Sequence, residues 1–164
     1  MIVMGIDPGL GTTGWAIIEG SGERPSLLAY GTIHTKPSED MPDRLLAICT
    51  RVGEVLTEHT PDEVVIEDVF MARDTKAALA LGQARGAAML GAALKNIPVR
   101  TYTALQVKQS VTGNGHASKD QEAFMVQQLF RLKAAPEPAD CADAAAIALC
   151  HMHRCRQMVT VGRS

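Results

Sequence analysis

The sequence predicts an α/β fold, a mixed five-stranded sheet flanked by helices, and two patterns carry that prediction. Three short apolar runs rich in β-branched residues follow one another in the first 34 residues, separated by turns that contain glycine. Beyond them, two further apolar runs alternate with longer segments of helical periodicity, the pattern of strands joined by helical crossovers. A length of 164 residues suits one domain, which we place at 1–156 with a flexible tail at 157–164.

The strand predictions rest on apolar runs that end at turn residues. The expected strands cover residues 2–6, 12–18, 26–34, 63–67 and 98–102. The first ends at the Asp-Pro-Gly turn that begins with Asp7, and short turns join the first three strands into an antiparallel meander. The fourth, EVVIE, is apolar without alternation, which indicates burial on both faces.

The helix predictions rest on apolar spacing and on capping residues. The expected helices cover residues 43–59, 75–95, 104–110, 119–131 and 140–154. Ser118 and Gln121 fit a capping box at the start of the fourth helix. A helix that leads from one strand to the next implies parallel pairing, so strands four and five should lie alongside strand one. This order of elements is the one found in ribonuclease H-like domains.

Charge is segregated along the chain, although the formal net charge is only −2. Residues 1–70 hold 4 basic and 12 acidic side chains, whereas residues 71–119 hold 7 basic side chains and a single acidic one. The basic side chains of this middle segment are Arg73, Lys76, Arg85, Lys95, Arg100, Lys108 and Lys119. A basic segment can contact phosphates and an acidic one can surround a cation, with solvated surfaces as the alternative.

Neither a membrane-spanning run nor a secretory leader is evident in the sequence, so we expect a cytoplasmic protein. Its four cysteines do not suggest a disulfide framework. Cys150, His151, His153 and Cys155 lie close together in sequence, and on a helix they form two pairs that point in different directions. We therefore do not expect a zinc site there.

Four carboxylates stand at positions suited to metal binding, and each has a structural alternative. Asp7 follows an apolar strand, where an aspartate before Pro-Gly also forms turns. Glu67 ends a buried strand, where a charge costs free energy unless it is paired or metal-bound. Asp140 and Asp143 share a face at the start of the last helix, where acidic residues also interact favourably with the helix dipole.

Considered together, these carboxylates predict a site for Mg²⁺. Hard cations prefer carboxylate oxygens, and Mg²⁺ retains water ligands that a substrate phosphate can replace. Two ions bound close together can activate water and stabilise the leaving oxygen of a phosphodiester. The expected cofactor is therefore Mg²⁺, with up to two ions per subunit and Mn²⁺ as a substitute.

Nearly the whole chain resembles the RuvC-type Holliday junction resolvases. The matching motifs are GIDPGLGTTGWA at 5–16, EDVFMA at 67–72, LGQARG at 81–86, QVKQSVTGNGHASK at 106–119 and DCADAAAIALCH at 140–151. The resemblance implies a homodimer with a ribonuclease H-like core that nicks opposite strands of a four-way DNA junction symmetrically. It also implies cooperation with the branch-migration proteins RuvA and RuvB.

The resemblance assigns roles to individual residues. The family's metal-binding catalytic acids are matched by Asp7, Glu67, Asp140 and Asp143. The candidates for DNA contact are one aromatic and four basic side chains: Phe70, Arg73, Lys76, Lys108 and Lys119. Lys108 and Lys119 match phosphate-binding residues of the family, and Phe70 matches a base-contacting aromatic, with a buried core position as its alternative. Some members carry histidine where this chain has Asp140, and alanine is more usual where it has Cys141.

Several readings of the sequence stay open. Gly82 and Gly86 form a small-x-x-x-small pattern that suits close packing of a helix, either within the chain or from a second subunit. The stretch DPGLGTTG at 7–14 also resembles the phosphate loop of actin-, Hsp70- and sugar-kinase-type ATPases, which usually pair two such subdomains. A nuclease acting on RNA and a junction-binding protein without catalysis are the other rivals. His151 lies too far along the helix from Asp140 to share a metal ion with it.

Overall fold

The computed structural model describes residues 1–20, 24–68 and 74–161, with side chains described as far as Arg156. Its strands are β1 (Ile2–Asp7), β2 (Thr12–Glu19), β3 (Ser26–His34), β4 (Glu63–Asp68) and β5 (Val99–Thr103). Its helices are α1 (Met41–His59), α2 (Thr75–Ala93), α3 (Ala104–Thr112), α4 (Lys119–Leu129) and α5 (Ala139–Val161). Within the described ranges, no helix is long and apolar enough to cross a bilayer.

The strands form a single mixed sheet in the order β3-β2-β1-β4-β5. The pairs β1–β2 and β2–β3 are antiparallel, whereas β1–β4 and β4–β5 are parallel. The predicted meander and the parallel pairing after each helical crossover are therefore confirmed. Strand β5 lies beside β4 and not beside β1, so of the two later strands only β4 pairs directly with β1.

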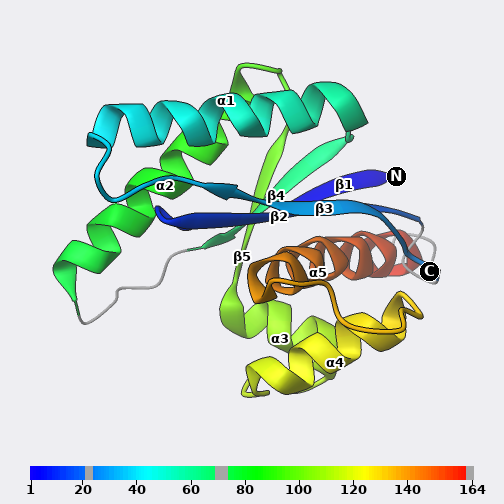
Figure 1. Cartoon of the computed structure of the whole chain (residues 1–164). Helices are drawn as coiled ribbons and strands as arrows, with labels where there is room; N and C mark the ends of the chain where they lie inside the picture. Colours follow the sequence, from blue (N-terminus) through cyan, green and yellow to red (C-terminus); the bar gives the residue numbers. More distant parts are fainter. Residues whose placement is uncertain (21–23, 69–73, 162–164) are drawn as a thin grey trace.

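The two faces of the sheet carry different helices. Helices α1 and α2 cover one face, and α3, α4 and α5 lie on the other (Figure 1). Successive residues of a strand point to opposite faces, and β1 shows this alternation: Met4 and Ile6 belong to the core under α1 and α2, whereas Val3 belongs to the core under α5. By the same alternation, Asp7 at the end of β1 lies on the α5 face.

Helix α5 packs unusually close to the sheet because two glycines remove side chains from its path. A Cβ at Gly5 on β1 would clash with the backbone carbonyl of Ala144, and a Cβ at Gly14 on β2 would clash with that of Asp140. The alanine-rich middle of α5 is fully buried against these strands. The start of α5, which carries both aspartates, is thereby held against the carboxyl end of β1.

The ends of several helices differ from the sequence predictions. The capping box at α4 is confirmed: the Gln121 amide donates to Ser118 Oγ at 3.2 Å, and the Ser118 amide donates to Gln121 Oε1 at 2.9 Å. Helix α5, expected to end near Arg154, continues to Val161 into the segment we predicted to be a tail. Residues 162–164 lie outside the described ranges.

Candidate active site

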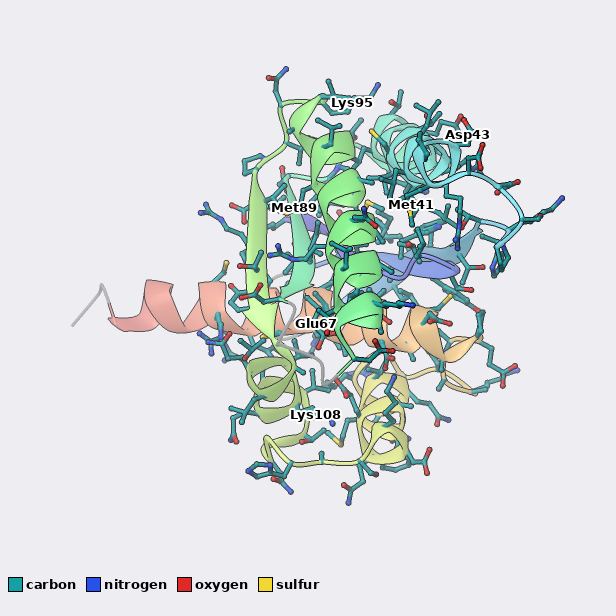
Figure 2. The ribbon with its side chains drawn as sticks, turned by 90° about the vertical axis from the view of Figure 1, so that its left-hand side faces the viewer. Met41, Asp43, Glu67, Met89, Lys95 and Lys108 are labelled. Atoms are coloured by element: carbon teal, nitrogen blue, oxygen red, sulfur yellow. The ribbon has the colours of Figure 1, made fainter. Side chains whose placement is uncertain are left out.

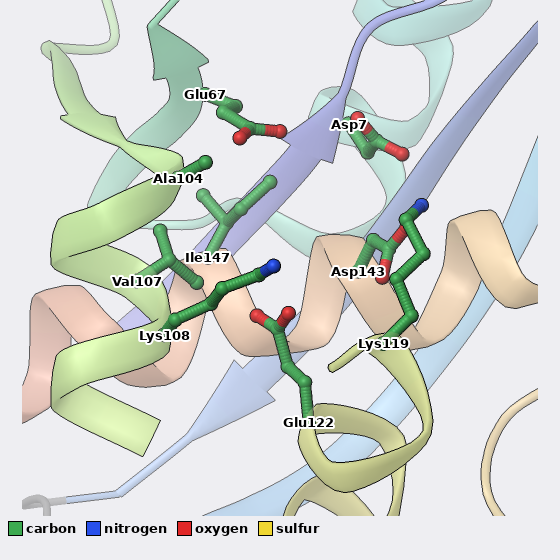
Figure 3. A pocket seen from close by; sticks show the side chains of 9 residues that line it. All are labelled: Asp7, Glu67, Ala104, Val107, Lys108, Lys119, Glu122, Asp143 and Ile147. Carbon is green, nitrogen blue, oxygen red and sulfur yellow. The ribbon is translucent and has the colours of Figure 1, made fainter. Parts of the chain in front are cut away.

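Acidic side chains from distant parts of the sequence meet where β1 and β4 end. Ile6 of β1 and Ile66 of β4 are partners in the parallel register, so the residues that follow them, Asp7 and Glu67, emerge at the same edge of the sheet. Helix α5 brings Asp143 to this edge. One pocket of about 140 Å³ is lined by Asp7, Glu67, Ala104, Val107, Lys108, Lys119, Glu122, Asp143 and Ile147 (Figure 3).

Three of the four predicted acids thus line one pocket, and the fourth lies next to it. Asp140 is not among the lining residues, although its negative charge contributes to the raised pKa of Asp7. Asp140 and Asp143 are separated by less than one helical turn, so their side chains point in directions that differ by a small rotation about the helix axis. That difference is enough for Asp143 to line the pocket while Asp140 lies beside it. The expectation that these acids would converge in space agrees with the geometry, and the catalytic role of each remains a prediction.

The pocket concentrates negative charge. The pKa of Asp7 is raised to about 7, first because the carboxyl is buried and then because Asp143 and Glu67 lie nearby. The pKa of Glu67 is raised as well, again by burial first and by Asp143 second. Carboxyl groups whose pKa is raised by burial and by neighbouring carboxylates form a site where a bound cation would be favourable.

Lysine side chains offset part of this charge. Lys119 Nζ donates a hydrogen bond to Asp143 Oδ2 at 2.7 Å, and this bond raises the pKa of Lys119. The charges of Lys119 and then Lys108 partly oppose the rise in the pKa of Glu67. In the part of the chain that the structure describes, no three acidic, histidine or cysteine side chains are placed to hold one ion together. The donors fit Mg²⁺ nonetheless, because that ion commonly uses only one or two carboxylates and keeps several waters.

Arg85 of the LGQARG motif fixes the end of β4 that carries Glu67. Its Nε donates to the backbone oxygen of Glu67 at 3.1 Å, and its guanidinium lies 3.1 Å from the carboxylate of Asp68. Arg85 is therefore a positioning residue for this edge of the sheet. Arg85 belongs to the basic segment for which phosphate contact was one interpretation. Its ion pair with Asp68 gives it a structural role.

The remaining basic residues are spread over the molecule. Lys108 and Lys119 line the pocket, whereas Lys95 lies at the opposite end of α2 from Glu67 (Figure 2). Arg100 is paired with Glu63 at the other end of β4. Of the basic residues in this segment, two lysines therefore lie at the acidic pocket, whereas Lys95 and Arg100 lie away from it.

Among the described residues, Lys76 is the remaining candidate for DNA contact, and it does not line the pocket. Lys76 is exposed in the first turn of α2. Phe70 and Arg73 lie outside the described residues, so their predicted DNA contacts are not addressed by the structure. All three stay predictions.

One pocket residue, Glu122 of α4, was not predicted from the sequence. Its side chain is only 7% exposed, and its pKa is raised to about 7, chiefly by burial and next by Asp143. A signal was available in the helical spacing, because Glu122, Val126 and Phe130 recur every four residues and all three are buried. A charged residue on an apolar helix face is a candidate for a functional role.

The histidine and cysteine cluster of α5 belongs to a different region. His151 Nε2 lies 2.8 Å from Glu63 Oε2 and 3.4 Å from Cys155 Sγ, and His151 Nδ1 is hydrogen-bonded to the hydroxyl of Tyr102 at 2.9 Å. This network lies at the opposite end of β4 from Glu67, so His151 is remote from the carboxylate pocket.

Comparisons with known proteins agree with this architecture. Residues 3–151 match the family model described as crossover junction endodeoxyribonuclease RuvC. The chain belongs to the RuvC family. A RuvC relative from Shewanella loihica is 44% identical over 161 residues, which cover 98% of this chain and 92% of the relative. The RuvC family consists of endonucleases that require a divalent metal ion, so the predicted enzyme class is confirmed.

Solved structures confirm the ribonuclease H-like fold that the element order predicted. A structure of Thermus thermophilus RuvC in complex with Holliday junction substrate has a TM-score of 0.92 and 38% identity, covering 96% of both chains. The yeast mitochondrial Holliday junction resolvase shares the fold, with a TM-score of 0.65 at 12% identity over 96% of this chain and 84% of its own. Membership of the RuvC family removes the ATPase alternative, since its phosphate-loop motif is here the β1–β2 turn of a nuclease.

Proposed function

We propose that this chain resolves four-way DNA junctions by metal-dependent hydrolysis, with Asp7, Glu67 and Asp143 as its catalytic acids. The observation that carries the proposal is their convergence in one pocket from β1, β4 and α5, where the partly buried Asp7 has a pKa of about 7. Bound Mg²⁺, or Mn²⁺ in its place, would supply an activated water and would stabilise charge on the leaving oxygen. Two ions per subunit suit the several carboxylates of the site.

The acidic and basic residues at the pocket have different proposed roles. Asp7 and Glu67 extend from adjacent strands of a rigid sheet, which suits them to hold a cation in a fixed position. Asp140, next to the pocket, adds negative charge beside Asp7 and so favours cation binding. Lys108 and Lys119 provide the positive charge that a scissile phosphate requires, and Lys119 would exchange its bond to Asp143 for one to DNA.

A homodimer follows from the substrate and from the surface of α2. A junction cut symmetrically in two strands needs two active sites, and a two-fold dimer supplies them. One face of α2 is apolar and exposed: Leu79, Gly82, Gly86, Leu90 and Ala93. A Cβ at Gly82 or Gly86 would meet no atom within 4 Å, so these glycines do not serve close packing against the described part of the chain. This supports the alternative in which a second subunit packs on α2.

The wider setting of the reaction is proposed from the family. Branch-migration proteins of the RuvA and RuvB type are the expected partners, because RuvC acts on the junctions that they move. Since the proposed substrate is DNA and the relatives from Shewanella loihica and Thermus thermophilus are bacterial, we propose the cytoplasm as the place of action.

Substitution of Asp7 tests the proposed function. Asp7→Asn should lower Mg²⁺-dependent nicking of a four-way DNA junction at least about a hundredfold, the loss typical when stabilisation of transition-state charge is removed. Junction binding, measured by gel shift, should be retained. Asp43→Asn is the matched control because Asp43 is exposed on α1, on the other face of the sheet.

The same assay separates the rival functions. Wild-type nicking by the Asp7→Asn variant would remove Asp7 from the mechanism. Binding without any metal-dependent cleavage by the unmodified chain would favour the non-catalytic junction binder. Faster cleavage of a matched RNA junction than of the DNA junction would favour the RNA-directed nuclease.

A further inference from the structure

Glu122 occupies a position that packing alone does not explain. Its side chain is 7% exposed, and among the described residues its carboxylate takes part in no hydrogen bond or ion pair. The side chain points from α4 into the carboxylate pocket (Figure 3). Its carboxylate oxygens are not sealed from water, because no fully buried side-chain oxygen of the described residues lacks a hydrogen-bond partner, so they open into the pocket. A largely buried carboxylate without a partner in the chain is unfavourable, and an apolar residue would be the more stable choice at this position.

The helix places this side chain in the pocket by its own periodicity. Helix α4 is capped by Ser118, and its buried face carries Glu122 and Val126. Asp120, also in the first turn, is exposed. Both acids can interact with the positive end of the helix dipole. That interaction does not account for the burial of Glu122, since Asp120 has the same benefit while exposed to water.

The charges around Glu122 indicate what it could bind. The negative charges of Asp143 and Glu67 raise its pKa, whereas Lys108 and Lys119 lower it. Neither lysine lies within ion-pair distance of Glu122, and Lys119 is already paired with Asp143. With all groups ionised, four carboxylates face two ammonium groups in this pocket, which leaves the two negative charges that one divalent cation would balance.

We propose that Glu122 is a further cation-binding residue of the nuclease site, supplying a carboxylate from α4 across the pocket from Asp7 and Glu67. The proposal rests on the metal-dependent function proposed above and adds a donor to it. Glu122 approaches from the helical side of the pocket, whereas Asp7 and Glu67 extend from the sheet. A cation bound by Glu122 and by one of these strand acids would therefore connect α4 to the sheet edge.

Cation binding to the metal-free, full-length chain tests this role without an activity assay. Calorimetric titration with Mn²⁺ at pH 8 should show that Glu122→Gln weakens binding roughly tenfold or more, the range seen when groups that support a metal site are removed. Asp120→Asn is the matched control, because it removes the same charge from the same helical turn. Its exposed charge is screened by salt, so Mn²⁺ affinity should change little.

Thermal unfolding gives a second, independent readout. Without metal at pH 8, Glu122→Gln should raise the Tm, since it removes an unpaired buried charge, and the Tm increase on adding Mn²⁺ should shrink. A residue with a purely structural role would show the reverse, a lower Tm in the variant and an unchanged response to Mn²⁺. Glu122→Ala should show the same loss of Mn²⁺ affinity, so the conclusion does not depend on one variant.

A comparison with Asp143→Asn separates the two proposals. If Glu122→Gln binds Mn²⁺ like the unmodified chain while Asp143→Asn does not, the role of Glu122 is wrong and the proposed metal site stands. If neither substitution changes Mn²⁺ affinity, the proposed metal site itself is wrong.

Discussion

The two ends of β4 carry the same residue type on the same face of the sheet, with opposite surroundings. Glu63 at the start of the strand accepts two hydrogen bonds from Arg100, at 3.2 and 3.3 Å, and lies 2.8 Å from the imidazole of His151. Glu67 near the end of the strand has Asp7 and Asp143 as neighbours, and its pKa is raised. Glu63 is paired with side chains of its own chain, whereas Glu67 is left to interact with a partner from outside the chain.

This difference distinguishes a structural acid from a functional one. Burial costs free energy at both positions, and at Glu63 the protein offsets that cost with its own donors. At Glu67 the fold instead gathers further carboxylates, and even the ion pair of Arg85 goes to the adjacent Asp68. A family of metal-dependent nucleases provides the missing partner, because a divalent cation neutralises several carboxylates at once.

The largest expected effect comes from neutralising each glutamate in turn. Glu67→Gln should abolish nicking of a four-way DNA junction and should leave metal-free stability equal or higher, since it removes a crowded charge. Glu63→Gln should retain nicking but lose about 1–3 kcal/mol of unfolding free energy, because buried polar partners such as His151 lose their charged acceptor. Junction cleavage and urea unfolding in EDTA measure the two effects. If both variants lose cleavage, or if neither does, the assignment of Glu67 as functional and Glu63 as structural is wrong.

The pH dependence of stability should reveal the unmatched acids. Asp7 and Glu122 have pKa values of about 7 in the folded chain, raised from ordinary values of 3.8 and 4.5. Between those values the folded state binds more protons than the unfolded state, so the contribution of these groups to stability is complete below about pH 4 and is lost as pH rises to about 7. Urea unfolding in EDTA should therefore show a smaller fall in stability between pH 5 and pH 8 for Asp7→Asn than for the unmodified chain. An equal fall would mean that Asp7 is not the titrating group.

The sequence predicted those features that depend on local signals and on simple topology rules. The meander follows from turn residues, and the meeting of Asp7 with Glu67 follows from the rule that parallel strands joined by a helix end at one edge. The acidic pair Asp140 and Asp143 followed from its spacing at the start of the last helix, and family resemblance added the two pocket lysines. These predictions required no knowledge of how the helices pack.

The features that the sequence did not predict depend on how each helix is rotated about its axis and on how closely it packs against its neighbours. Asp143 lines the pocket and Asp140 flanks it because α5 is seated on Gly5 and Gly14, and that contact is not encoded next to either aspartate. Glu122 was missed because a charged residue in a helix is usually exposed, and only its spacing from Val126 and Phe130 indicated the face that α4 packs against α3 and α5. The length of α5 likewise exceeded its predicted end at Arg154.

The smallest expected effect concerns the one lysine that is bonded to an acid of the pocket. Lys119 is 74% exposed at its side chain, so its ion pair with Asp143 contributes at most about 1 kcal/mol to stability. Lys119→Ala should therefore change unfolding only slightly, while lowering the slope of log junction affinity against log salt by about one, the effect of losing one phosphate contact. Lys95→Ala, at the far end of α2, is the control and should leave the slope unchanged. A slope unaffected by Lys119→Ala would place this lysine with Arg100, as a partner for an acid of its own chain and not for DNA.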